Sequence, residues 1–234
     1  MADGRLDALV ARTPLAAGDH VLEVGCGKGA FLVALLGRWP RATAEGFDRN
    51  PWFLADARDA AAAAGPDIAR RVSFVETDAP GALIDDRAVA MTVAMGATGA
   101  FEGDQAATVL ALARATRPGG VVVFADGLWL REPPADGLAA FGMARDELVD
   151  GVEGFAGLGI DAGLEPLDIE VVDEAEWDAY EASYAGAVHA WAAANPADPD
   201  RAGFLARAAA MRASYAAWRR DAFGYAIGRF RVPT

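Results

Sequence analysis

The sequence predicts an α/β fold built on a parallel, doubly wound β-sheet, and three observations support this prediction. Apolar, β-branched segments alternate with helical segments over the first half of the chain. These strands read as continuous apolar runs, which is typical of parallel strands buried on both faces. A glycine-rich turn, Gly25 to Gly29, joins the first strand directly to a helix. Such a turn brings backbone N–H groups and the positive end of the helix dipole close to a ligand.

Turn residues delimit the elements of the first half. Trp39-Pro40 ends a helix, because proline cannot continue one. Asn50-Pro51 opens the next helix, since proline is favoured at an early helical position. Gly65-Pro66 breaks that helix, and Pro118-Gly119-Gly120 stops a later one. We expect helices at residues 5–12, 30–38, 51–64 and 104–117, and strands at residues 21–24, 43–47, 72–76, 88–94 and 121–125.

The second half has a different pattern. Residues 127–150 form an irregular segment with short helical pieces, a helix follows at 151–162, and residues 167–172 are a sixth strand. Two long helices at 174–194 and 198–222 are separated by Asn195-Pro196, and residues 225–232 form the last strand. We therefore expect one domain with four parts: a core at 1–126, a segment with a lid, a helix and the sixth strand at 127–173, a helical cap at 174–222 and the final strand at 223–234.

Composition excludes several classes of function. The chain of 234 residues is 53% hydrophobic, yet no stretch approaches the roughly 20 apolar residues of a membrane span. One cysteine, Cys26, excludes an internal disulfide and argues against a structural zinc site, so we expect a cytoplasmic protein without a metal. The net charge of −13 argues against nucleic acid as a partner, because phosphate backbones attract Lys and Arg.

The spacing of Gly25, Gly27 and Gly29 also fits a loose dinucleotide fingerprint, so the glycines alone leave the cofactor open. The residues around the glycines are more informative about the cofactor. Glu23 lies two residues before the first glycine, and Asp48 ends the second strand, where a carboxylate can accept hydrogen bonds from both ribose hydroxyls. Further matching elements are Asp78 after the third strand, Gly96 after the fourth, and Arg117-Pro118-Gly119-Gly120 before the fifth.

Together these elements resemble the class I S-adenosylmethionine-dependent methyltransferase family. The motifs that carry the resemblance stand in the family order over residues 20–126: Leu22-Glu-Val-Gly-Cys-Gly-Lys-Gly29, Gly46-Phe-Asp48, Glu76-Thr-Asp-Ala79, Met95-Gly96 and Arg117-Pro-Gly-Gly-Val121. The resemblance implies a Rossmann-like sheet of seven strands whose last strand is reversed. It also implies S-adenosylmethionine as the cofactor, lying across the carboxyl ends of the strands.

The resemblance assigns a role to each motif residue. The three glycines would line the methionine moiety, Glu23 would support the turn or the amino group, and Cys26 within the turn would contribute backbone rather than a nucleophile. Asp48 would hold the ribose and Arg49 would lie beside the adenine. The remaining residues fall into two groups: Asp78 and Ala79 at the adenine edge, and Met95 and Gly96 facing the methionine end through their backbone.

Substrate recognition is expected in the second half. Each long helix carries an apolar stripe at helical spacing, which predicts either a hairpin that buries both stripes or a cap over the cofactor. The stripes are Trp177, Tyr180, Tyr184, Val188 and Trp191, and then Phe204, Ala208, Met211, Tyr215, Trp218 and Ala222. Candidate substrate contacts are Phe101, Trp129, Tyr180 and Tyr184, and Phe141 and Met143 could belong to a lid.

We therefore expect a methyltransferase that transfers a methyl group to an oxygen or nitrogen atom of a small molecule. We expect it to be a monomer or a homodimer. The sulfonium methyl is already activated, so a general base is needed only for an acceptor that is protonated at neutral pH. Candidate bases are His189, on the first long helix, and Asp126, at the end of the fifth strand. Two alternatives stay open: a silent S-adenosylmethionine-binding regulator, and a nicotinamide-dependent oxidoreductase, which would need neither Glu23 nor Asp78.

Overall fold

The computed structural model describes residues 3–78 and 88–234, and the chain divides into two compact units. The first, called the sheet unit, contains the chain up to Asp126 together with residues 152–170 and 226–234. The second, called the helical unit, contains residues 127–151 and 171–225. The expected grouping of the chain into a single domain with a cap stays a prediction.

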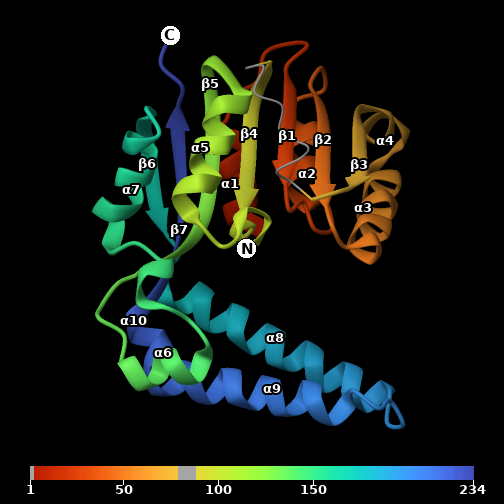
Figure 1. Cartoon of the computed structure of the whole chain (residues 1–234). Coiled ribbons are helices and arrows are strands. Elements are labelled where there is room, and N and C mark those ends of the chain that lie inside the picture. Colours follow the sequence, from red (N-terminus) through yellow and green to blue (C-terminus); the bar gives the residue numbers. More distant parts are fainter. Residues whose placement is uncertain (1–2, 79–87) are drawn as a thin grey trace. The chain divides into compact units, whose positions relative to one another are not determined.

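The sheet has seven strands in the order β3-β2-β1-β4-β5-β7-β6. Their bounds are β1 (His20–Val24), β2 (Thr43–Asp48), β3 (Val72–Glu76), β4 (Val89–Met95), β5 (Thr116–Trp129), β6 (Glu165–Val171) and β7 (Phe223–Arg231). The pairs from β3 to β5 are all parallel, and β7 runs against them (Figure 1). The predicted Rossmann-like sheet with a reversed last strand is therefore confirmed.

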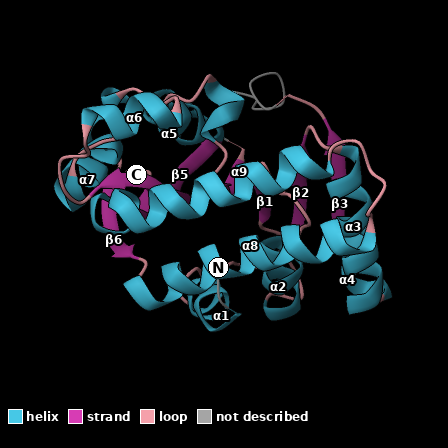
Figure 2. Ribbon diagram, turned by 90° about the horizontal axis from the view of Figure 1, so that it is seen from below, coloured by secondary structure: helices cyan, strands magenta, loops and turns pink. Residues whose placement is uncertain are grey.

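Helices cover both faces of the sheet. On one face lie α1 (Asp3–Ala11), α2 (Ala30–Arg38) and α3 (Pro51–Ala64), and on the other lie α5 (Gln105–Ala115) and α7 (Gly151–Asp161) (Figures 1 and 2). This arrangement buries the middle strands on both sides, as the run of buried residues from Ala90 to Ala94 shows. Val93 in this run is fully buried, which stabilises the fold by about 1.5–3 kcal/mol.

A short helix, α4 (Pro66–Arg71), follows α3, where we expected only a break. The reason is that Pro66 both stops the preceding helix and suits the first position of a new one. Arg71 ends α4 and donates hydrogen bonds to the carbonyl oxygens of Leu36, Trp39 and Ala42, at 2.9 to 3.3 Å. This short helix thereby satisfies carbonyl groups at the end of α2 and in the following turn.

The expected helix at 104–117 ends earlier, at Ala115, and β5 begins at Thr116. Thr116 is buried and its hydroxyl lies 2.8 Å from that of Thr92, which anchors it beside β4. The register then shifts: Thr116 pairs with Val89, but Val121 pairs with Met91. The four residues between them bulge out, and Gly119 takes a left-handed conformation with φ of +75°.

The helical unit contains α6 (Ala135–Phe141), α8 (Glu174–Ala194), α9 (Arg201–Ser214) and α10 (Arg220–Ala222). Helices α8 and α9 pack side by side (Figures 1 and 2). The expected helix at 198–222 is not uniform, because Tyr215–Arg219 forms a π-helical turn between α9 and α10. No helix in the described part of the chain is both long enough and apolar enough to span a membrane.

Candidate functional site

The turn after β1 depends on glycine at three positions. Gly25, Gly27 and Gly29 have φ values of +65°, +53° and +73°, a left-handed region that other residues enter at a cost. A Cβ on Gly25 would lie 2.5 Å from that of Ala97, and one on Gly29 would lie 2.8 Å from the ring of Phe74. Two of the glycines thus let the turn pack against neighbouring elements. A Cβ on Gly27 would meet no atom of the described chain within 4 Å, so Gly27 is the one that borders open space.

Asp48, at the end of β2, binds this turn directly. Its Oδ2 accepts a hydrogen bond from the N–H of Gly27 at 2.8 Å, and its Oδ1 accepts one from the N–H of Asn50, also at 2.8 Å. Each carboxylate oxygen can accept a second hydrogen bond. The carboxylate is therefore fixed in orientation and still has acceptor capacity, as a group that binds vicinal hydroxyls requires.

Glu23 is a buried carboxyl group beneath the same turn. It is 3% exposed, and its Oε2 has no hydrogen-bond partner among the residues that the structure describes. Burial, and secondarily the negative charge of Asp48, raise the pKa of Glu23 well above its ordinary value. A buried carboxyl oxygen without a donor fits a site for a ligand that carries a positive charge or an N–H group.

Cys26 fills space inside the turn. It is buried, its N–H donates to the carbonyl of Phe47 at 2.9 Å, and its carbonyl accepts from the N–H of Gly29 at 2.9 Å. A Cβ on Gly46 would come within 2.8 Å of its sulfur, so glycine is needed on the neighbouring strand β2. Burial, followed by the charges of Glu23 and Asp48, raises the pKa of the Cys26 thiol and keeps it neutral.

The loop after β4 holds the next predicted residues. Gly96, with φ of +64°, donates its N–H to the carbonyl of Ala125 at 2.7 Å, and Met95 before it is half-buried. Phe101 ends the short 3₁₀ helix η2 (Thr98–Phe101) and is buried. Because Ala97 packs against Gly25, this loop and the glycine turn meet at the carboxyl edge of the sheet.

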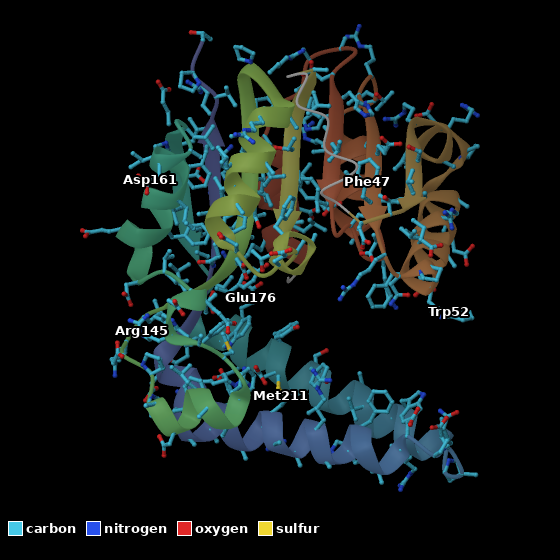
Figure 3. All side chains as sticks on the ribbon, in the orientation of Figure 1. Phe47, Trp52, Arg145, Asp161, Glu176 and Met211 are labelled. Carbon is cyan, nitrogen blue, oxygen red and sulfur yellow. The ribbon has the colours of Figure 1, made fainter. Side chains whose placement is uncertain are left out.

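The predicted adenine contacts are exposed at the same edge. Arg49 and Asp78 are both accessible, and Ala79 lies outside the described residues. The sequence analysis did not single out Trp52, which projects from the start of α3 with 80% of its surface exposed (Figure 3). Its neighbour Phe53 has Lys28 over its ring, 5.8 Å from the centroid.

The other predicted residues divide between the two units. Asp126 is half-buried at the end of a segment of the sheet unit, whereas His189 is exposed on α8 in the helical unit. Tyr180 and Tyr184 are also on α8, and Tyr180 is 52% exposed. Trp129 is only 1% exposed, and its Nε1 donates to the carbonyl oxygen of Arg145 at 2.9 Å.

The helical unit contains an aromatic cavity of about 270 Å³. Its lining combines two of the predicted substrate contacts and both predicted lid residues with side chains from α8, α9 and the π-helical turn. The lining residues are Trp129, Phe141, Met143, Trp177, Tyr180, Glu181, Met211, Trp218, Arg219 and Phe223. A lining of aromatic and apolar side chains with few polar groups is typical of cavities that bind small molecules.

Sequence reasoning missed the ion pair in this cavity. Arg219 Nη2 lies 3.0 Å from Glu181 Oε1, and the two side chains are 6% and 10% exposed. The residues are 38 positions apart on different helical segments, and neither lies on the predicted apolar stripes. Only the packing of α8 against the π-helical turn brings them together, so no local pattern could have identified the pair.

Residues 21–120 match the model of a family described as a methyltransferase domain. A curated relative, the uncharacterized protein YjhP of Escherichia coli K12, is 28% identical over 214 residues, which cover 90% of this chain and 83% of YjhP. Trans-aconitate 2-methyltransferase of Escherichia coli O157:H7 is 41% identical, but over 70 residues that cover 30% of this chain and 25% of the enzyme.

A solved structure agrees over the whole chain. It is described as an S-adenosylmethionine-dependent methyltransferase from Geobacter sulfurreducens in complex with S-adenosylhomocysteine. The two folds superpose with a TM-score of 0.86 and 26% sequence identity, and the match covers 99% of this chain and 92% of the other. The likeness therefore extends beyond the residues matched by the family model and includes the second half of the chain.

Proposed function

Because the chain belongs to the class I S-adenosylmethionine-dependent methyltransferase family, we propose that it transfers the methyl group of this cofactor to an oxygen or nitrogen atom of a small molecule. The observation that carries the proposal is the contact between Asp48 and Gly27, which joins two of the family motifs into one preorganised cradle. Each motif position that the family uses to bind the cofactor carries a matching residue in this chain. We take this as favouring an enzyme over a silent binding protein.

The residues of the sheet unit fit this cofactor. Glu23 supplies a buried carboxyl oxygen that has no donor among the described residues, which suits a cationic ligand, and a Cβ on Gly27 would meet none of their atoms within 4 Å. We assign the ribose hydroxyls to Asp48, the methionine end to the glycine turn with Met95 and Gly96, and the adenine to Arg49 and Asp78. The cofactor supplies a methyl group that is already activated by its positive sulfur.

The work left to the protein is alignment and exclusion of water. In the reaction, a lone pair of the acceptor forms a bond to the methyl carbon as the carbon–sulfur bond breaks. The products are the methylated acceptor and S-adenosylhomocysteine, and an acceptor that carried a proton also releases it. We propose Asp126 or His189 as the group that takes this proton, where the acceptor requires a base.

The rest of the proposal concerns the location of the protein, its contacts with the acceptor and its partners. A single cysteine, buried and neutral, supports a cytoplasmic location, because the chain needs no oxidising compartment for its fold. Phe101, Trp129, Tyr180 and Tyr184 are proposed to contact the acceptor. We propose a monomer or a homodimer, with no nucleic acid or membrane partner, in line with the net charge of −13.

Calorimetry with S-adenosylmethionine, S-adenosylhomocysteine and NAD tests the cofactor. We expect the first two to bind and NAD not to bind, and the reverse would remove the methyltransferase proposal. A screen of small molecules scored by release of S-adenosylhomocysteine then separates an enzyme from a silent binder. Binding of the cofactor without turnover on any O- or N-acceptor in a broad screen would favour the regulatory alternative.

A further inference from the structure

We infer that Asn50 is a positioning residue for the cofactor: it acts through Asp48 and sets how strongly the protein recognises the hydroxyl groups of the ribose. The inference rests on the proposed function, which assigns those hydroxyls to Asp48. All of the contacts involved lie within the sheet unit. Phe47 and Trp52, which come just before and just after the two residues in the sequence, are labelled in Figure 3.

The carboxylate of Asp48 is held by backbone N–H groups alone. Its own backbone is fixed at the end of β3, because its carbonyl oxygen accepts from the N–H of Thr77 at 3.2 Å and the residue pairs with Glu76. Among the described residues the carboxylate has no ion pair and no side-chain donor, only the N–H groups of Gly27 and Asn50, each at 2.8 Å. The orientation of this carboxylate therefore depends on where two N–H groups point.

The direction of the Asn50 N–H is set on both sides of the residue. A residue before proline is restricted to extended conformations, and Asn50 has φ of −97° and ψ of 105° ahead of Pro51. Its side-chain Oδ1 accepts hydrogen bonds from the N–H of Trp52 at 3.0 Å and that of Phe53 at 3.4 Å, and so caps α3. The side chain thereby ties the backbone of Asn50 to the first turn of α3, and its N–H meets the carboxylate of Asp48.

A carboxylate held in one orientation binds two neighbouring hydroxyls better than a mobile one. Each oxygen of Asp48 already accepts one N–H and can accept a further hydrogen bond. Without the N–H of Asn50 the carboxylate turns more freely, because the terminal torsion of an Asp side chain is broad. Binding of the ribose would then have to order the side chain, which lowers affinity. Asn50 thus contributes to hydroxyl recognition without touching the ligand.

Two other contacts in the sheet unit provide matched controls. Lys28 Nζ lies 2.7 Å from Asp56 Oδ2 and also connects the glycine turn with α3, but the side chains are 64% and 52% exposed. Exposed ion pairs of this kind contribute little. Asp104 caps α5, on the other face of the sheet, by accepting from the N–H of Ala107 at 2.9 Å (Figure 1). The first contact controls for the connection to α3, and the second for the loss of a helix cap as such.

Calorimetry with two probes measures hydroxyl recognition: S-adenosylhomocysteine, and its 2′,3′-dideoxy analogue, which lacks both ribose hydroxyls. We expect the ratio of their affinities to fall by about fivefold in Asn50→Ala, and to stay near the wild-type ratio in Asn50→Ser, since serine also caps helices. Asp56→Asn and Asp104→Ala should keep the wild-type ratio. An unchanged ratio in Asn50→Ala, or an equal fall in Asp104→Ala, would overturn the inference.

The route through Asp48 has a test of its own. In Asp48→Ala the group that Asn50 positions is gone, so the addition of Asn50→Ala should leave the ratio of affinities unchanged. A further fall of about fivefold in the double variant would show that Asn50 affects the ligand by another route. It would then not be a positioning residue for Asp48.

Hydrogen exchange on the wild-type protein gives a result that does not depend on the folding of a variant. Coupling between two sites is reciprocal, so a ligand that engages Asp48 should also stabilise the capped turn. We expect S-adenosylhomocysteine to slow the exchange of the N–H groups of Asn50, Trp52 and Phe53 more than the dideoxy analogue does. The N–H of Ala107 should not respond. Equal slowing by the two ligands would contradict the role given to Asn50.

The same measurements separate this inference from the proposed function. If S-adenosylhomocysteine does not bind to the wild type, the proposed function fails. If it binds and the ratio is unchanged in Asn50→Ala, the inference fails and the methyltransferase proposal stands. If the wild type binds both probes equally well, the ribose hydroxyls are not held by Asp48. The inference then fails together with that assignment, while binding of the cofactor product still supports a methyltransferase.

Discussion

The Oδ2 of Asp48 accepts a hydrogen bond from the backbone N–H of Gly27 at 2.8 Å, so the end of β2 holds the glycine turn of β1 in place. The second oxygen of the same carboxylate accepts from the N–H of Asn50, which caps α3 through its side chain. One carboxylate thereby organises the turn, the strand end and the start of a helix. Its remaining acceptor capacity is what we propose binds the ribose hydroxyls of the cofactor.

Asp48→Ala removes this connection, and we expect the affinity for S-adenosylmethionine to fall by about 1–3 kcal/mol, as for a lost hydrogen bond to a charged group. Asp48→Asn keeps one acceptor oxygen and should lose less. Calorimetry gives both values, with Asp59→Ala, an exposed position on α3, as the control. If Asp48→Ala binds the cofactor as the wild type does, Asp48 does not belong to the site.

Gly27 and Gly29 should respond differently to alanine. Both have a left-handed φ, which costs a residue with a Cβ about 1–2 kcal/mol. A Cβ on Gly29 would in addition lie 2.8 Å from the ring of Phe74 and 3.0 Å from Ala57, while one on Gly27 would meet nothing of the described chain within 4 Å. Urea unfolding should therefore show the larger loss of stability for Gly29→Ala, and Gly27→Ala should chiefly lose cofactor affinity. Equal losses of stability would contradict this reading of the turn.

The sheet unit could be predicted from the sequence because its signals are local. A glycine turn or an acidic residue directly after an apolar run identifies that run as a strand. It also places the glycine or the acidic residue at the carboxyl edge of the sheet. The helix α4 was missed because Gly65-Pro66 was interpreted only as a break, although proline also suits a first helical position. The early start of β5 was missed because the pairing of Thr116 with Val89 is a contact between distant segments.

The helical unit was predictable only in part. The stripes on α8 and α9 predict which faces are apolar, and several of their members do line the aromatic cavity. The spacing cannot show which face meets which, or that Arg219 and Glu181 form a buried pair. A π-helical turn also departs from the period of 3.6 residues on which the stripe of 198–222 was drawn.

Glu23 should make the stability of the protein depend on pH. Burial and Asp48 raise its pKa in the folded state, so the folded protein holds this proton more tightly than the unfolded chain, whose Glu pKa is about 4.3. The contribution to stability is therefore fully present below that value and is lost as the pH rises through the folded-state pKa. Glu23→Gln, which stays neutral, should show a smaller fall in the free energy of unfolding between pH 5 and pH 8.

Urea unfolding at a series of pH values measures this difference, and Glu76→Gln, at an exposed position on β3, serves as the control. The control should keep the pH dependence of the wild type. Parallel curves for the wild type and Glu23→Gln would mean that the carboxyl group of Glu23 is ionised in the folded protein, and that its Oε2 finds a donor in solution.

Removing one member of the Arg219–Glu181 pair should lower the stability of the protein more than replacing both members. Removing one partner leaves a buried charge alone, so Arg219→Met and Glu181→Leu should each destabilise the helical unit by about 3–5 kcal/mol. Replacing both removes the two charges together, and the double variant should be more stable than either single one. Unfolding followed by tryptophan fluorescence measures this, because four of the six tryptophans lie in the helical unit.

An exposed pair provides the comparison for this cycle. Arg145 lies 2.9 Å from Glu132, whose side chain is largely exposed, so Glu132→Gln should change stability by less than about 1 kcal/mol. If the effects of Arg219→Met and Glu181→Leu simply add in the double variant, the two charges do not interact in solution.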